Sequence, residues 1–218
     1  MNRLIVIEGL DGSGKSTQLE LLRKNLSGVH FITFPQYDSD SGHIISSYLS
    51  GLYNEQDPRI SAYSASVMYA VDRYTSCKTH WGALYGSGEP VISARYVSSN
   101  AVYQMTKLDK SEWNGYLEWL CDLEYEKLGM PRPDMTVFLD MPTEVSQKLL
   151  MKRYGGDESK KDIHERDTAY LARCREAAMF AAEKYGWTII PCSSNDIPRS
   201  ISDINADIMN AIKDLINA

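Results

Sequence analysis

The chain is predicted to be a doubly wound α/β protein in which helices cover both faces of a parallel sheet. Three observations support this fold class. Apolar runs of strand length alternate with longer stretches of helical periodicity. A hydrophobic fraction of 43% in 218 residues is enough for a substantial core. No internal repeat or low-complexity linker divides the chain, so a single domain over residues 1–218 is expected.

Five apolar runs are predicted to be the strands of this sheet. The first leads directly into a glycine-rich loop. The second stops at Pro35, whose missing N–H suits the end of a strand. The fourth is introduced by Pro133 and Asp134. In chain order, the predicted strands are residues 4–7, 29–34, 91–93, 135–140 and 188–190.

Helices are predicted where apolar residues recur every three or four positions. Ser98 or Ser99 is expected to cap the helix after the third strand, and Ser111 the next one, which should run to Gly129. The aromatic face of that next helix is expected in the core or at a subunit contact. Pro142 suits the first turn of a further helix. The other predicted helices cover about residues 15–26, 44–49, 61–85, 163–184 and 201–212.

Composition limits the partners of the protein. A formal net charge of −6 argues against a general nucleic-acid surface, so any anionic ligand must be held locally. No apolar run approaches a membrane span or a signal sequence, and the protein is expected to be soluble and cytoplasmic. The four cysteines are too scattered to suggest a zinc site or a disulfide framework. They are Cys77, Cys121, Cys174 and Cys192.

The glycine-rich loop after the first strand is predicted to hold phosphate. Its pattern is a glycine, four residues, then Gly-Lys-Ser. The glycines let backbone N–H groups converge on phosphate oxygens at the positive end of the following helix. Lys15 is expected to reach the outer phosphates, and the Ser16 hydroxyl to bind Mg²⁺. The loop and the start of the helix comprise Gly9, Leu10, Asp11, Gly12, Ser13, Gly14, Lys15, Ser16 and Thr17.

Such a loop occurs in kinases, GTPases and motor ATPases, so the reaction has to be read from the other strand ends. Ligands of parallel α/β sheets bind at the carboxyl ends of the strands. Arginine suits phosphate there, because a guanidinium donates two parallel hydrogen bonds to it. Three stretches are candidates: residues 34–35 and 95–104 follow the second and third predicted strands, and residues 69–74 lie in the predicted long helix.

Together these stretches resemble the thymidylate kinase family over almost the whole chain. Residues 7–18 are similar to its phosphate loop, and residues 133–140 to its fourth strand. The resemblance implies a P-loop NTPase fold, a homodimer, and transfer of the γ-phosphoryl group of ATP to dTMP, which supplies dTDP for nucleotide biosynthesis. The motifs similar to its monophosphate site are Phe34-Pro35, Ala-x-Asp-Arg at 70–73, Arg95-Tyr96, Ser99 and Tyr103-Gln104.

The resemblance also implies roles for single residues. Asp11 would position the acceptor, and Arg73 and Arg95 would grip the dTMP phosphate. Arg153 and Ser193 would lie beside the adenine of ATP. The implied catalytic residues are Asp11, Lys15, Arg95 and Arg153, with Mg²⁺ on Ser16. The implied acceptor site consists of Phe34, Pro35, Tyr37, Tyr69, which would stack on thymine, Arg73, Arg95, Ser99, Asn100, Tyr103 and Gln104.

A mobile lid is implied at about residues 152–162. Its basic residues would supply the transition-state cation, because Gly12 stands where one subgroup of the family has arginine. A solvated charge run is the alternative interpretation. Tyr37 stands near the sequence position at which many family members have a further phosphate-binding arginine. Arg59 could take the role of that arginine. The basic residues are Lys152, Arg153, Lys160 and Lys161.

One departure bears on catalysis. The family has Asp-Arg-Tyr or Asp-Arg-His after the third strand, whereas this chain has Ala94-Arg95-Tyr96. The family's aspartate organises Mg²⁺, its waters and the donor phosphates, which alanine cannot do. Its loss would lower turnover and spare nucleotide binding, because charge placement counts mainly in the transition state. Two alternatives stay open: a kinase for another deoxynucleoside monophosphate, and a catalytically weak nucleotide-binding protein.

Overall fold

A computed structural model describes residues 3–54, 60–153 and 167–217. Within these ranges, five parallel strands form one sheet in the order β2-β3-β1-β4-β5. The strand that leads into the phosphate loop is therefore central, and Ile7 pairs with Ala94 on one side and Val137 on the other. The predicted parallel α/β fold is confirmed. The strands are β1 (Leu4–Gly9), β2 (His30–Thr33), β3 (Val91–Ala94), β4 (Met135–Asp140) and β5 (Thr188–Pro191).

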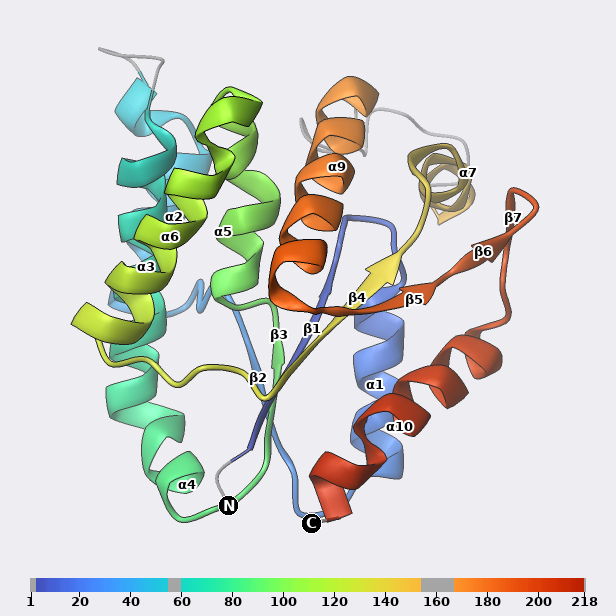
Figure 1. Ribbon diagram of the computed structural model, residues 1–218. Coiled ribbons are helices and arrows are strands. Elements are labelled where there is room, and N and C mark those ends of the chain that lie inside the picture. Colours follow the sequence, from blue (N-terminus) through green and yellow to red (C-terminus); the bar gives the residue numbers. More distant parts are fainter. Residues whose placement is uncertain (1–2, 55–59, 154–166, 218) are drawn as a thin grey trace.

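Helices cover both faces of the sheet (Figure 1). On one face lie α1 (Lys15–Asn25) and α10 (Ile201–Asn217), and on the other lie α5 (Val97–Tyr103) and α9 (Thr168–Tyr185). The other α-helices are α2 (Asp40–Leu49), α3 (Ala62–Ser76), α4 (Gly82–Gly86), α6 (Trp113–Cys121) and α7 (Thr143–Arg153). Short 3₁₀ helices cover Leu52–Asn54, Met105–Lys107 and Lys110–Glu112, and π-helical turns cover Cys77–Trp81 and Asp122–Lys127.

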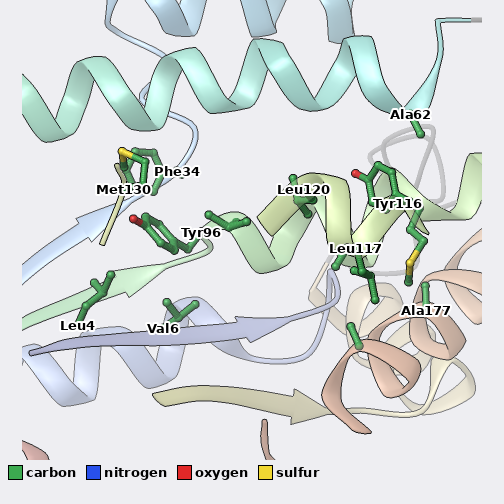
Figure 2. Close-up of a cluster of buried hydrophobic side chains, with 14 of the residues drawn as sticks. Leu4, Val6, Phe34, Ala62, Tyr96, Tyr116, Leu117, Leu120, Met130 and Ala177 are labelled. Carbon is green, nitrogen blue, oxygen red and sulfur yellow. The ribbon is translucent and has the colours of Figure 1, made fainter. Parts of the chain in front are cut away.

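Alternate residues of β1 pack against opposite layers. Ile5 and Ile7 belong to the cluster that includes Leu22 of α1. Leu4 and Val6 face the cluster on the other side of the sheet, which Figure 2 shows. All six residues of β1 are buried, so the strand is clamped from both sides. The loop that follows it therefore starts from a rigid position.

The predicted helix over residues 61–85 is interrupted. It runs as α3 to Ser76, continues through the π-helical turn, and resumes as α4. Gly82 permits this turn, because a Cβ at that position would lie 2.4 Å from the carbonyl oxygen of Cys77. Apolar spacing predicts the extent of such a segment but cannot show a local change of helix type.

The predicted caps are wrong. Ser98 and Ser99 lie inside the first turn of α5, where their hydroxyls donate to Glu8 instead of to backbone groups of the helix. The next helical segment starts with a capping box between Asp109 and Glu112, so Ser111 is not its cap. Its aromatic face lies in the core as expected: Trp113 and Tyr116 are buried and Trp119 is partly buried.

A short hairpin after β5 was not predicted from the sequence. Its strands, β6 (Ser193–Ser194) and β7 (Ile197–Pro198), have only two residues each, too few for any periodicity. Asn195 and Asp196 form the turn with positive φ, which these two residue types tolerate well. In the described ranges, no helix has the length and apolar character needed to cross a membrane.

Candidate active site

The loop between β1 and α1 forms a cradle for an anion. Gly12 and Gly14 have backbone φ angles of 77° and 87°, a region that residues with a Cβ rarely adopt. Gly14 precedes α1, and no side chain caps the first N–H groups of that helix. The Ser13 hydroxyl is buried without a hydrogen-bond partner among the described residues. These groups fit the phosphates of a nucleotide such as ATP.

Lys15 lies inside this cradle, and its Nζ donates to the carbonyl oxygen of Gly9 at 3.3 Å. Burial and the nearby positive charge of Arg95 lower the pKa of Lys15 to about 8, against the opposing effect of Glu8 and Asp11. A phosphate that enters the cradle would favour the charged form of this amine. The charge of Lys15 therefore depends on what the cradle holds.

The part of the cradle around Ser16, where Mg²⁺ is expected, has few protein ligands for a metal ion. Ser16 presents its side chain to solvent at the start of α1. Within residues 3–54, 60–153 and 167–217, no group of three or more His, Cys, Asp or Glu side chains could hold a metal ion. A Mg²⁺ ion at Ser16 would therefore take its other ligands from phosphate oxygens and water, which Mg²⁺ often does.

A cavity of about 510 Å³ opens beside the phosphate loop. Asp11 lines it, and so do all ten residues expected at the acceptor site. Three stretches far apart in the sequence therefore meet at one cavity: two follow β2 and β3 at the carboxyl edge of the sheet, and the third lies on α3. The ten residues are Phe34, Pro35, Tyr37, Tyr69, Arg73, Arg95, Ser99, Asn100, Tyr103 and Gln104.

Arg95 joins the loop to this cavity. Its Nη2 donates to Asp11 Oδ1 at 2.6 Å, and its guanidinium lies 4.9 Å from the centroid of the Tyr103 ring. Although burial opposes the charge, Tyr103 and the carboxylates of Asp11 and Glu8 raise the pKa of Arg95, so it stays charged. Its backbone has φ of 65°, and the Ser93 hydroxyl donates to its carbonyl oxygen at 2.5 Å. The surroundings thus hold Arg95 in an unusual conformation.

Arg73 is held by a carboxylate that sequence reasoning did not identify. Its Nε donates to both carboxylate oxygens of Glu124, at 3.0 and 3.2 Å, and Nη2 forms an ion pair with the same group. Both side chains are buried. The preceding Asp72 does not line the cavity but accepts hydrogen bonds from Gln36 N and Ser41 Oγ, which anchor the loop after β2.

Tyr69, Gln104 and Lys107 also line the cavity. Tyr69 packs edge-on against Tyr48, with ring centroids 6.3 Å apart, and burial raises the pKa of Tyr69. Gln104 Oε1 is buried without a hydrogen-bond partner among the described residues. Lys107 donates to the Tyr48 hydroxyl at 2.7 Å, and burial lowers its pKa to about 8. The Tyr69 ring and the Gln104 amide oxygen suit a flat group with hydrogen-bond donors.

The donor side is described only in part. Leu150 of α7 lies against the loop, because a Cβ on Gly12 would be 3.1 Å from its Cγ. An arginine at position 12 would therefore meet α7. Arg153 ends this helix, but its side chain lies outside the described residues, as do Arg59 and almost all of the expected lid. Ser193 begins the hairpin after β5, at the carboxyl edge of the sheet.

The chain is similar to known proteins. Residues 7–204 match the family model described as thymidylate kinase. The chain belongs to the thymidylate kinase family. It is 32% identical to the thymidylate kinase of Mycobacterium tuberculosis over 196 residues, which cover 86% of this chain and 90% of that protein. It is also 32% identical to a probable thymidylate kinase of Thermococcus gammatolerans over 220 residues, which cover 98% and 97% of the two chains.

A solved structure shares the fold of this thymidylate kinase family member. The thymidylate kinase from Candida albicans superposes with a TM-score of 0.72 at 22% identity, over 98% of this chain and 92% of that chain. Both the family and the P-loop NTPase fold inferred from the sequence are confirmed.

Sequence reasoning missed several residues of this family member's site. Tyr48, Lys107 and Asp167 line the cavity, and Glu8 and Glu124 pair with the two arginines that line it. Each of them is a single polar residue on an otherwise ordinary helix, turn or strand. Glu8 belongs to residues 7–18, which resemble the family's phosphate loop, but its pairing with Arg95 has no local signature. No local pattern distinguishes the other four from surface positions.

Proposed function

We propose that this thymidylate kinase family member transfers the γ-phosphoryl group of ATP to dTMP. The position of Arg95 carries the proposal. Its guanidinium pairs with Asp11 of the phosphate loop at 2.6 Å and also lines the cavity that holds the acceptor residues. An acceptor phosphate bound to Arg95 would lie at the edge of the donor cradle, where transfer needs it.

In the proposed reaction the bond between the γ-phosphorus and the ADP oxygen breaks. A new bond forms to a phosphate oxygen of dTMP, so the products are ADP and dTDP. In this proposal Lys15, which lies in the cradle, holds the outer phosphates of the donor, and Arg95 exchanges Asp11 for the acceptor phosphate. Mg²⁺ at Ser16 would neutralise charge on the donor phosphates. No proton transfer is needed, because the acceptor oxygen is already ionised near neutral pH.

The role of Arg73 as a phosphate ligand stays a prediction, and its surroundings favour another one. Glu124 already balances its charge and takes up the hydrogen bonds of Nε and Nη2. We infer that Arg73 donates to an uncharged carbonyl of the base. Tyr69 and Gln104, which line the same cavity, support this placement because they are neutral groups suited to a flat heterocycle.

A coupled assay of ADP release tests the acceptor. With ATP and Mg²⁺, we expect kcat/KM for dTMP to exceed that for dUMP, dCMP, dGMP and AMP by at least about tenfold. Tenfold is the low end for dUMP, which lacks only the apolar 5-methyl group, and the other bases also differ in their hydrogen-bonding groups. Preference for another monophosphate would contradict dTMP as acceptor. Nucleotide binding without turnover, both by this chain and by Ala94→Asp, would contradict the kinase assignment and leave a nucleotide-binding module.

We also propose that the protein is a homodimer that pairs through α3. One side of this helix exposes Tyr63, Val67, Val71 and Tyr74, at fractions of 37%, 44%, 41% and 36%. Their spacing places them on one stripe, and a continuous apolar stripe is unusual on the surface of a monomer.

Light scattering tests the pairing. We expect the mass of two chains for the unaltered protein and of one chain for Val67→Glu, because a charge in a buried apolar contact is costly. Ile197→Glu places the same charge on a 67% exposed residue of the β6–β7 hairpin and should leave the dimer intact. Equal masses for all three proteins would contradict pairing through α3.

A further inference from the structure

Glu8 is a fully buried carboxylate near the end of β1. A buried carboxylate is costly unless donors and cations surround it. The hydroxyls of Ser98 and Ser99 donate to its Oε2 at 2.9 and 2.6 Å, and the backbone N–H of Gly9 donates to its Oε1 at 3.0 Å. Three donors from two elements therefore hold this carboxylate in one place.

The Oε1 atom of Glu8 also faces Arg95, whose Nη1 lies 3.9 Å away. Arg95 therefore has two acidic neighbours, and they differ in access. The side chain of Asp11 is 29% exposed and lines the acceptor cavity, whereas that of Glu8 is 0% exposed and lies behind the cavity wall. An entering phosphate can replace Asp11 as the partner of Arg95, but it cannot reach Glu8.

Ser99 links the acceptor cavity, which it lines, to Glu8. The family resemblance implies that Ser99 belongs to the acceptor site. Its Oγ lies 2.6 Å from Glu8 Oε2, a short hydrogen bond to a charged group, which is stronger than a neutral one. Ser99 thus donates its only hydroxyl proton to Glu8 and helps to fix that carboxylate next to Arg95.

We propose that Glu8 is a positioning residue that keeps Arg95 aimed at the acceptor phosphate once the phosphate has displaced Asp11. Glu8 touches neither nucleotide and acts through Arg95. The proposal rests on the dTMP kinase function proposed above and adds a residue of β1 to the acceptor site.

The sign of the effect separates positioning from simple electrostatics. Removal of a negative charge close to an anion site should by itself strengthen the binding of a phosphate. If Glu8 positions Arg95, its removal should weaken that binding, because the guanidinium is then free to adopt other orientations. Thymidine lacks the phosphate, so its binding should depend little on Arg95.

The decisive variant is Glu8→Gln, with calorimetric titration of dTMP and of thymidine. We expect the Kd of dTMP to rise about tenfold, the effect of losing one well-oriented charged contact, and that of thymidine to stay within about twofold. The KM for dTMP should rise in parallel while the KM for ATP changes little. Glu183→Gln removes the same charge at an exposed position of α9 and should change neither Kd.

A second variant covers the case in which Glu8→Gln fails to fold. Ser98→Ala with Ser99→Ala keeps the carboxylate but removes two of its donors, and should weaken dTMP binding in the same direction. If Glu8→Gln, or the double variant in its place, binds dTMP as tightly as the unaltered chain or more tightly, the positioning role is wrong. If the unaltered chain neither binds nor phosphorylates dTMP, the proposed function fails instead.

Discussion

Replacement of Ala94 by aspartate is expected to raise kcat about 100-fold, the typical effect of one charged group that stabilises a transition state. Ala94 ends β3 and packs with Ile7 and Leu19, on the side of the sheet that α1 covers. Ser16 lies at the start of this same helix. A carboxylate at position 94 would therefore project toward the proposed Mg²⁺ site. The KM values should change little, because this charge would act mainly in the transition state.

Ala94→Asn is the matched control, since it has nearly the same shape as aspartate but no charge. Its kcat should stay near that of the unaltered chain. A titration of free Mg²⁺ should reach half-maximal rate at a lower concentration for Ala94→Asp than for either other protein. The aspartate should also lower the Tm without nucleotide, because residue 94 is only 6% exposed. A kcat within twofold of the unaltered chain would mean that catalysis here does not need an acid at position 94.

Glu124→Gln is expected to destabilise the fold by about 3–5 kcal/mol, the usual cost of breaking a buried ion pair on one side. Burial opposes the charge on Arg73, yet Glu124 raises the pKa of Arg73 above its ordinary value. Arginine does not lose its proton when the partner goes, so the charge would stay buried and uncompensated. For a chain of this size the Tm should fall by about 6–20 °C, measurable by circular dichroism.

Two controls identify the cause of that loss. Glu126 pairs with Arg132 on the surface, with both side chains more than half exposed. Glu126→Gln should therefore cost about 0–1 kcal/mol. Arg73→Met combined with Glu124→Met removes both buried charges and should recover most of the stability, but not acceptor binding, because Arg73 lines the cavity. An unchanged Tm for Glu124→Gln would contradict the role of this pair in stability.

Prediction from the sequence failed where a polar side chain had several possible partners. Ser98 and Ser99 have the composition of helix caps, but both hydroxyls donate to Glu8, which lies 90 and 91 residues earlier. A charged acceptor competes well with backbone groups for a hydroxyl. The expected cap at Ser111 failed for another reason, since Asp109 and Glu112 form a capping box two residues earlier.

The sequence by itself determined the parallel sheet, the phosphate loop and the three stretches that form the acceptor cavity. The sheet and the loop follow from apolar runs and glycine spacing, and the acceptor stretches from the carboxyl ends of parallel strands together with the resemblance to the thymidylate kinase family. Only the tertiary structure decided the charge partners. Asp11 meets Arg95 across 84 residues, and Arg73 meets Glu124 across 51. A single acidic residue has no periodicity, and its partner depends on distances and burial that only the packing of the whole sheet sets.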